Sequence, residues 1–380
     1  MENLIVLNPF VVGKYVSDKY FCDREKETEF LIKQVENGRN VALISPRRMG
    51  KTGLVQHCFQ QSRLSDSYYT FFVDIYATSS LAEFVYLLGK NIYETLKPKR
   101  TAWTEKFFQM IASLRVGFKL DAVTGEPGFD IGLGDIQAPR TTLDEIFRYL
   151  ESADKPCIVA IDEFQQIAKY PEKNIEALLR THIQKLGNCN FIFAGSERHM
   201  MQEMFTSSAR PFYNSADLLE LRAIAPEIYI PFVCGHFEKR NRYIAPENVE
   251  WVYRLFKGHT YYIQRTFNEA FADTSEGEEC TREIIEDAIE NMVASNDTIF
   301  REILSNIPEK QKALLYAIAK DDEARGITSA DFIKRHSLPS ASSVQAASKK
   351  LLEKDYITEI NKVYSLTDKL FAMWISRLCR

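Results

Sequence analysis

The sequence predicts an α/β fold in which a mostly parallel sheet carries a phosphate-binding loop, followed by a helical segment and a winged helix. Three observations lead to this prediction. Apolar strands alternate with helical stretches over the first 235 of the 380 residues, as in a parallel sheet covered by helices. A loop motif at 45–52 follows the first strand. A later strand ends in two adjacent carboxylates, Asp162 and Glu163.

Length and composition are those of a soluble globular protein with a large core. Hydrophobic residues make up 45% and charged residues 26% of the chain, which are ordinary values. The seven cysteines are scattered and form no C-x-x-C pair, which indicates a reduced protein without a zinc site or disulfide framework. The first residues lack the features of a signal peptide, and no apolar run approaches membrane-spanning length. We therefore expect a cytoplasmic location and no membrane partner.

The expected core strands are short, apolar and rich in β-branched and aromatic residues, so we expect them to be buried on both faces. They span 41–44, 70–76, 157–161, 190–194 and 217–222. A helix that begins near Asp23 ends at Gly38 and Asn40, before the first strand. Alternating apolar residues around a turn at 124–127 predict a β-hairpin insertion at about 115–136. This hairpin either contacts a partner or packs on its own domain.

The remainder of the chain is mainly helical. Helical segments are expected near 246–257, 261–273 and 281–305, and then near 309–320, 329–336 and 340–354. Two short strand-like runs follow, at 356–360 and 363–366. Three helices and a closing hairpin form a winged-helix plan. We therefore expect three domains, which are a core at 1–235 with the hairpin insertion, a helical lid at 236–306 and a winged-helix domain at 307–380.

The segment SPRRMGKT at 45–52 is the clearest functional motif. It follows the pattern G-x-x-x-x-G-K-[ST], except that Ser45 takes the place of the first glycine. The amides of such a loop and of the following helix surround an anion. Gly50 allows close approach, Lys51 would reach the outer phosphates, and Thr52 would ligate Mg²⁺. We predict an ATP or ADP site formed by Pro46, Arg47, Arg48, Met49, Gly50, Lys51, Thr52 and Gly53.

Two carboxylates supply the second half of the expected site, at the strand ends where α/β sheets bind ligands. We expect Asp162 to help hold Mg²⁺ and Glu163 to orient the attacking water. Ser196, after the next strand, either reaches the γ-phosphate or the water, or belongs to a turn that caps the following helix. The predicted catalytic residues are therefore Lys51, Glu163 and Ser196.

Other candidates are less specific. Arg210, Arg222 and Arg265 could each place a guanidinium on the transferring phosphoryl group, and a solvated surface charge is the alternative for each. The segment Phe21–Glu27 either lines the adenine pocket or starts a helix with acidic residues at its positive end.

The C-terminal segment has a charge bias of its own. The whole chain has a net charge of −4, whereas residues 301–380 contain 14 Lys and Arg against 10 Asp and Glu. The expected recognition helix, from Ser340 to Lys350, offers side chains that contact bases and phosphates. Glu353 and Asp355 follow closely and dilute the positive potential. Duplex DNA and a protein partner both remain open for the winged helix.

With these motifs identified, the sequence resembles the archaeal-type ATPase family, of the AAA-related STAND class, over nearly its whole length. The resemblance rests on five segments, which are Phe21–Glu27, Pro46–Thr52, Ile161–Gln165, Phe193–Ser196 and Tyr364–Asp368. It implies a P-loop NTPase core with strand order 5-1-4-3-2, a helical lid and a winged helix. It also implies that ATP binding works as a switch, and it leaves a nucleotide-dependent oligomer open.

The sequence departs from this family pattern in three places. Ser45 replaces the loop glycine, the tripeptide at 213–215 lacks the arginine of Tyr-Gly-Arg, and the tripeptide at 258–260 lacks the proline of Gly-x-Pro. We therefore expect a Mg²⁺-dependent ATPase that hydrolyses slowly and acts as a nucleotide-dependent switch. The alternatives are a nucleotide-binding interaction module that does not hydrolyse and a DNA-binding regulator that acts through the winged helix.

Overall fold

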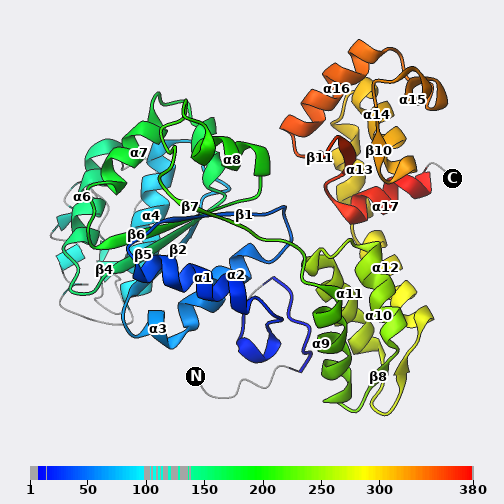
Figure 1. Ribbon diagram of the computed structural model, residues 1–380, viewed down its shortest axis with the longest axis horizontal. Helices are drawn as coiled ribbons and strands as arrows, with labels where there is room; N and C mark the ends of the chain where they lie inside the picture. The colour runs from blue at the N-terminus through cyan, green and yellow to red at the C-terminus, as the bar shows by residue number, and fades with distance from the viewer. Residues whose placement is uncertain are drawn as a thin grey trace. The chain divides into compact units, whose positions relative to one another are not determined.

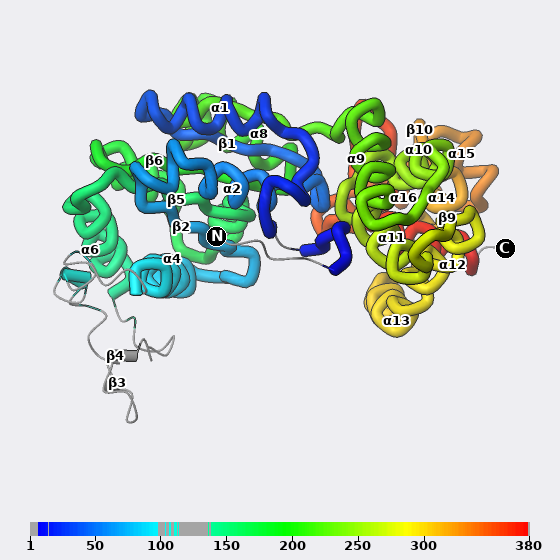
Figure 2. The backbone as a smooth tube through the Cα atoms, turned by 90° about the horizontal axis from the view of Figure 1, so that it is seen from below, coloured from blue at the N-terminus to red at the C-terminus, as the bar shows by residue number. Residues whose placement is uncertain are grey.

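The computed structural model describes residues 7–13, 15–97 and 138–378, and between the last two ranges residues 103, 106, 107, 110, 111, 113, 119, 120, 127, 128 and 136. The chain divides into two compact units (Figures 1 and 2). The core unit comprises Gly13–Tyr229 and His259–Tyr261, and the C-terminal unit comprises Met1–Val12, Ile230–Gly258 and Tyr262–Arg380. Among the described residues, no helix is long and apolar enough to span a bilayer. The expected domain boundaries after residues 235 and 306 stay predictions.

A five-stranded parallel sheet forms the centre of the core unit (Figure 1). Its strands lie in the order β2-β5-β6-β1-β7, and every neighbouring pair is parallel. Counted along the chain as the first to fifth core strands, this order is 2-3-4-1-5, which is the predicted order read from the other edge. The predicted fold class is therefore confirmed. The strands span Val41–Ile44 (β1), Tyr69–Asp74 (β2), Cys157–Asp162 (β5), Cys189–Gly195 (β6) and Asp217–Glu220 (β7).

Helices cover both faces of this sheet, which explains why its central strands β1, β5 and β6 are mainly apolar and buried. The strands β2 and β7 were also expected to be buried on both faces, but they lie at the edges of the sheet and are only partly buried. In β5, Ile158 and Ala160 pack with α1 and α2, while Val159 and Ile161 face the cluster that contains α4, α6 and α7. This division follows from the period of two along a strand. The helices span Glu25–Glu36 (α1), Lys51–Gln60 (α2), Ser62–Ser65 (α3), Leu81–Leu96 (α4), Pro139–Glu151 (α6), Ile175–Ile183 (α7) and Arg198–Thr206 (α8).

The expected hairpin insertion is described only in part. Lys119–Leu120 (β3) pairs antiparallel with Pro127–Gly128 (β4). Apart from Ile136, the other residues of the range 115–136 lie outside the described residues. The extent of the hairpin and its role stay predictions.

Helices also predominate between residues 226 and 305. They span Pro226–Glu238 (α9), Pro246–Leu255 (α10), Thr260–Asp273 (α11), Arg282–Ala294 (α12) and Asp297–Ser305 (α13). The single segment expected at 281–305 is therefore divided into two helices. Ser295 and Asn296 both donate side-chain hydrogen bonds to the carbonyl of Met292, and such bonds compete with helix continuation. A short parallel pair, Tyr243–Ile244 (β8) with Glu279–Cys280 (β9), also interrupts the helices.

The C-terminal residues form a winged helix, as predicted. Its helices span Glu309–Asp321 (α14), Ala330–Arg335 (α15) and Ala341–Glu353 (α16), and its hairpin pairs Ile357–Ile360 (β11) with Val363–Leu366 (β12). Two elements were not predicted. Ala324–Arg325 (β10) adds a third strand beside β12. Lys369–Leu378 (α17) begins after Asp368, whose carboxylate accepts from the amides of Leu370 and Phe371.

Candidate nucleotide-binding site

The loop between β1 and α2 has the backbone geometry that an anion site requires. Gly50 caps α2 with φ +91°, a conformation that side chains other than glycine rarely adopt. Arg48 also has a positive φ, of 68°. Lys51 is the first residue of α2 and is buried. The amides of this helix N-terminus and its dipole therefore favour a bound phosphate.

Ser45 fits the loop without the conformational freedom of a glycine. Its backbone does not adopt a positive φ, and its amide donates to the carbonyl of Gly195 at 3.2 Å. Its hydroxyl donates to the carbonyl of Pro46 at 3.1 Å. The serine side chain is thus buried and hydrogen-bonded, which explains how it replaces the usual glycine here.

Thr52 and Asp162 lie together, although 110 positions separate them in the sequence. The Thr52 hydroxyl donates to Asp162 Oδ2 at 2.7 Å, and the amide of Glu163 donates to Asp162 Oδ1 at 3.0 Å. Burial raises the pKa of Asp162, while the charge of Lys51 and the Thr52 hydrogen bond oppose this rise. The hydroxyl oxygen of Thr52 and the carboxylate oxygens of Asp162 are metal ligands of the kind that Mg²⁺ prefers.

Thr52 and Asp162 fit a Mg²⁺ ion that is bound together with a nucleotide. Mg²⁺ usually takes one or two carboxylates and completes its shell with waters and substrate phosphates. No group of three or more His, Cys, Asp or Glu side chains suited to a metal occurs in the described part of the chain. The oxygens of Thr52 and Asp162 therefore match a Mg²⁺ site that water and nucleotide phosphates complete, rather than a site formed by protein side chains alone.

Glu163 is the centre of the polar network beside the loop. Its backbone lies in the left-handed region, with φ 56° and ψ 40°, which is uncommon for a residue with a side chain. Lys51 Nζ lies 3.9 Å from Glu163 Oε1. Ser196 Oγ donates to Glu163 Oε2 at 2.5 Å, and Gln165 Nε2 donates to the same oxygen at 2.6 Å. The structure thus brings together Lys51, Glu163 and Ser196, and their catalytic roles stay predictions.

Two contributors to this network carry no role in the sequence prediction. The Gln165 side chain is buried and binds Glu163. Its only sequence signal is its place at the end of the segment Ile161–Gln165. Gly195 leaves room for it, because a Cβ there would lie 2.4 Å from Met201 Sδ and 2.5 Å from Gln165 Oε1. The end of β6 therefore requires glycine for close packing, not for an unusual φ.

The two loop arginines point to different neighbours. Arg47 Nε donates to Ser196 Oγ at 3.4 Å, and its guanidinium lies 5.1 Å from the ring centroid of Tyr76. The guanidinium of Arg48 lies over the ring of Tyr261, and its carbonyl accepts from Thr260 Oγ1 at 3.2 Å and from the Tyr261 amide at 3.1 Å. His259–Tyr261 belongs to the same compact unit as the loop.

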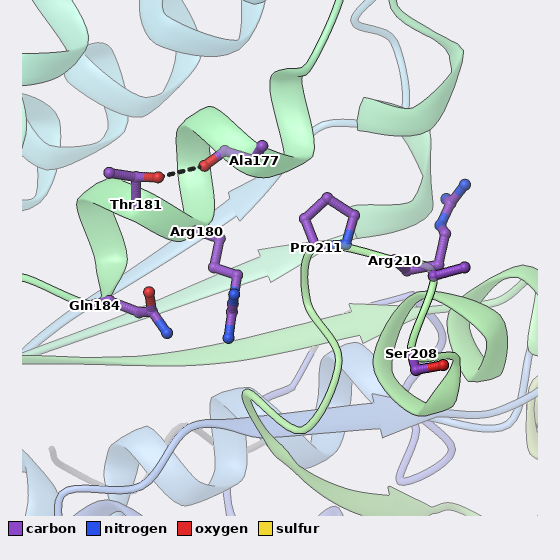
Figure 3. A pocket seen from close by; sticks show the side chains of 8 residues that line it. Ala177, Arg180, Thr181, Gln184, Ser208, Arg210 and Pro211 are labelled. Carbon is purple, nitrogen blue, oxygen red and sulfur yellow. Dashed lines mark hydrogen bonds between the residues drawn. The ribbon is translucent and has the colours of Figure 1, made fainter.

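The other candidate arginines pair with carboxylates. Arg210 lies 2.7 Å from Glu176 and 3.7 Å from Glu203, and it lines an open pocket beside α7 (Figure 3). Arg222 is exposed and lies 3.6 Å from Glu220. Arg265 lies 3.3 Å from Glu269 within the C-terminal unit. None of these ion pairs involves a residue of the loop.

Phe21 lies beside the first turn of α2. Its ring stacks on His57 with a centroid separation of 4.3 Å, and its Cε2 lies 3.5 Å from where a Cβ on Gly53 would be. Burial lowers the pKa of His57, which favours the neutral form of the ring that Phe21 stacks on. The segment Phe21–Glu27 also starts α1 with acidic residues, as the second alternative expected. A role at the adenine stays a prediction.

Comparisons with known proteins agree with this geometry. A family described as an ATPase domain predominantly from Archaea matches residues 21–266, and a probable winged helix domain matches residues 298–377. Comparison with the curated proteins finds no match.

Several solved structures share the fold. The Walker-type ATPase PABY2304 of Pyrococcus abyssi has a TM-score of 0.68 and 19% identity, with 97% of this chain and 99% of that chain covered. The Aeropyrum pernix ORC2 protein, in ADPNP–ADP complexes, has a TM-score of 0.63 and 14% identity, with 97% and 96% covered. The Aeropyrum pernix ORC1 protein in complex with DNA has a TM-score of 0.52 and 13% identity, with 94% and 93% covered.

Similarity at these identities concerns the fold alone, whereas the match to the ATPase family extends over more than half of the chain. The match also includes the phosphate loop, the carboxylates of β5 and Ser196. This chain therefore belongs to the family of ATPase domains found predominantly in Archaea.

Proposed function

We propose that this protein is a Mg²⁺-dependent ATP-binding switch of the AAA-related STAND class that hydrolyses ATP slowly. The observation that carries the proposal is the network of Lys51, Thr52, Asp162, Glu163 and Ser196 beside one helix N-terminus. Phosphoryl transfer needs an anion site, a cation site and a residue that orients water. Lys51 is suited to the first task, Thr52 and Asp162 to the second, and Glu163 with Ser196 to the third.

Binding follows from the loop and its first helical turn. The amides around Gly50 would surround the phosphates, and the buried ammonium of Lys51 would pair with the outer ones. Thr52 and Asp162 would hold Mg²⁺, which when bound neutralises charge on the phosphate oxygens. A bound cation would give Asp162 a charged partner in place of its hydrogen bond from Thr52, which would offset the cost of its burial.

The arrangement around Glu163 supports slow hydrolysis. A residue that orients and polarises water needs an accepting carboxylate oxygen. Glu163 Oε2 already accepts from Ser196 and Gln165, and Oε1 faces Lys51. Turnover therefore requires one of these partners to give way to water, which adds a step before chemistry.

The switch role rests on the carbonyl of Arg48. It accepts hydrogen bonds from Thr260 and Tyr261, at the start of α11. A change in loop conformation between the ATP and ADP states would therefore act directly on the beginning of this helix. Such coupling requires that the two nucleotides differ in their contacts with the loop.

Duplex DNA is the second candidate ligand, through the winged helix. Gln345 and Lys349 are exposed on α16, whereas Lys350 is 2.7 Å from Glu353. The ion pair lowers the pKa of Glu353, so the two charges largely cancel at neutral pH. Binding that falls steeply with salt and weakens in Lys349→Glu would support DNA binding. Binding insensitive to both would count against it.

The primary test measures Mg·ATP binding and turnover in the wild type, Lys51→Ala and Glu163→Gln. We expect Lys51→Ala to lose affinity by at least about 10-fold, and Glu163→Gln to bind normally but turn over about 100-fold more slowly. Glu29→Gln, which alters an exposed carboxylate on α1, is the matched control and should resemble the wild type. Equal turnover in the wild type and Lys51→Ala would exclude catalysis at this loop. Retained binding with turnover unaffected by Glu163→Gln would favour the non-hydrolysing module.

A further inference from the structure

Arg47 connects the phosphate loop to the residue expected to orient water. Its Nε donates to Ser196 Oγ at 3.4 Å, and that hydroxyl donates to Glu163 Oε2 at 2.5 Å. On the other side of the same carboxylate, Lys51 Nζ lies 3.9 Å from Oε1. Two cations therefore flank Glu163, one directly and one through a serine.

Phosphoryl transfer spreads negative charge over the γ-phosphate oxygens, and P-loop enzymes commonly stabilise this charge with a guanidinium. In the described core, the other arginines considered for this role are either missing from the sequence or lie beside a carboxylate. The tripeptide at 213–215 contains no arginine. Arg210 pairs with Glu176, and Arg222 is an exposed residue beside Glu220. Arg47, by contrast, is joined to the Glu163 network through Ser196.

Two contacts of Arg47 in this structure are ones that a phosphate can replace. Its guanidinium lies over Tyr76, a ring that is 56% exposed, and cation–π contacts at exposed sites are weak. Its hydrogen bond to Ser196 is long. A guanidinium pairs much more strongly with a phosphate, often through two parallel hydrogen bonds.

From this arrangement we propose that Arg47 binds the γ-phosphate of ATP in the same chain and thereby controls the hydrogen bond between Ser196 and Glu163. The inference rests on the proposed function and specifies how its site distinguishes ATP from ADP. Without a γ-phosphate, Arg47 stays on Ser196 and Tyr76. With ATP, it turns to the phosphate, and Ser196 becomes able to reorient away from Glu163.

This assignment goes beyond a general role in the loop. A residue that only shapes the loop would affect every bound nucleotide alike, because both ADP and ATP use the loop amides. A residue that contacts the γ-phosphate affects ATP selectively. The ratio of the two affinities therefore separates the two roles.

The test compares the wild type with Arg47→Gln, which retains a side-chain N–H for Ser196 but no charge. Affinities for Mg·ADP and for a non-hydrolysable Mg·ATP analogue are measured by calorimetry, and ATP turnover is measured in parallel. We expect the analogue to bind about 10- to 100-fold more weakly, ADP to change by less than about 2-fold, and kcat to fall at least about 10-fold. Equal losses for ADP and the analogue would overturn the proposal.

A matched variant and a conservative variant sharpen this test. Arg48→Gln removes the same charge from the neighbouring position, and we expect any loss of affinity there to be similar for ADP and the analogue. Arg47→Lys keeps the charge but not the planar fork, and it should restore part of the analogue affinity. A thermal melt establishes that each variant is folded, and Arg47→Lys alone provides the ratio if Arg47→Gln is unfolded.

Failure of this inference is distinguishable from failure of the proposed function. If the wild type binds neither nucleotide, the proposed function is wrong and the inference falls with it. If the wild type binds and hydrolyses ATP, Lys51→Ala is inactive, and Arg47→Gln shows no selective loss for the analogue, only the role of Arg47 is wrong.

Discussion

The end of β6 offers a sharp test of how packing positions the site. Gly195→Ala adds one methyl group between Met201 and Gln165. The new Cβ would lie 2.4 Å from Met201 Sδ, 2.5 Å from Met201 Cγ and 2.5 Å from Gln165 Oε1. Both side chains are buried, so neither can simply turn into solvent.

The size of the effect follows from these distances. Non-bonded atoms prefer separations of about 3.5–4.0 Å, so the neighbours must move by about 1 Å. Overpacking of this kind costs about 1–3 kcal/mol. For a unit of this size, each 1 kcal/mol lowers the melting temperature by about 2–4 °C, which predicts a fall of about 2–12 °C.

The same methyl group should also reduce turnover. Gln165 must withdraw, and its hydrogen bond to Glu163 Oε2, now 2.6 Å, would break. A displacement of about 1 Å in a catalytic group can cost up to 100-fold in rate, so we expect a loss of about 10-fold or more. Nucleotide affinity should change little, because the phosphate loop itself is not altered.

Thermal melts and steady-state turnover are the assays, and Gly235→Ala is the control. Gly235 lies in α9, and a Cβ added there would meet no described atom within 4 Å beyond its chain neighbours and its own helix backbone. That substitution should stabilise the protein by about 0.5–1 kcal/mol, because alanine loses less entropy than glycine in a helix. Unchanged melting and turnover in Gly195→Ala would refute the argument that β6 needs glycine for packing.

Three further predictions concern the rest of the site. Asp162→Asn should raise the melting temperature of the nucleotide-free protein at pH 7 by about 2 °C. Because burial raises the pKa of Asp162, its stabilising contribution is present below the ordinary Asp pKa and lost as the pH rises through the folded value. The gain from Asn should therefore be small in acid and grow toward neutral pH, and a gain that is largest in acid would contradict this sign. Thr52→Val should weaken ATP binding with Mg²⁺ present but not with EDTA, as calorimetry can establish; equal losses in both would argue against a metal role. Phe21→Ala should weaken ATP binding but not tripolyphosphate binding if Phe21 contacts the adenine, and an unchanged ATP affinity would leave Phe21 only its packing role against His57.

Much of the fold could be predicted because its signals are local. The apolar runs at 41–44 and 157–161 match β1 and β5 to within one residue, since a doubly buried strand needs little more than a short apolar segment. The turn at Gly50 was also predictable, because its positive φ favours glycine. The strand order, by contrast, came from the resemblance to a known family and not from periodicity.

The features that the sequence did not predict share a physical cause. A strand of two residues, such as β10, has no periodicity to detect, and it exists because β12 lies beside it. The break between α12 and α13 depends on Asn296 reaching the Met292 carbonyl, a side-chain choice that competes with a strong helical pattern. In both cases a neighbour decides the local structure.

The sequence by itself determined the chemistry at each point, because the loop motif and the adjacent carboxylates are short segments with local meaning. Only the tertiary structure decided which groups meet. The parallel sheet aligns the ends of β1, β5 and β6, and so brings Lys51, Glu163 and Ser196 together. It also places Arg47 beside Ser196, and so one side chain away from the Glu163 carboxylate. No spacing in the sequence could show this, because hydrogen bonds between distant residues depend on distances in space.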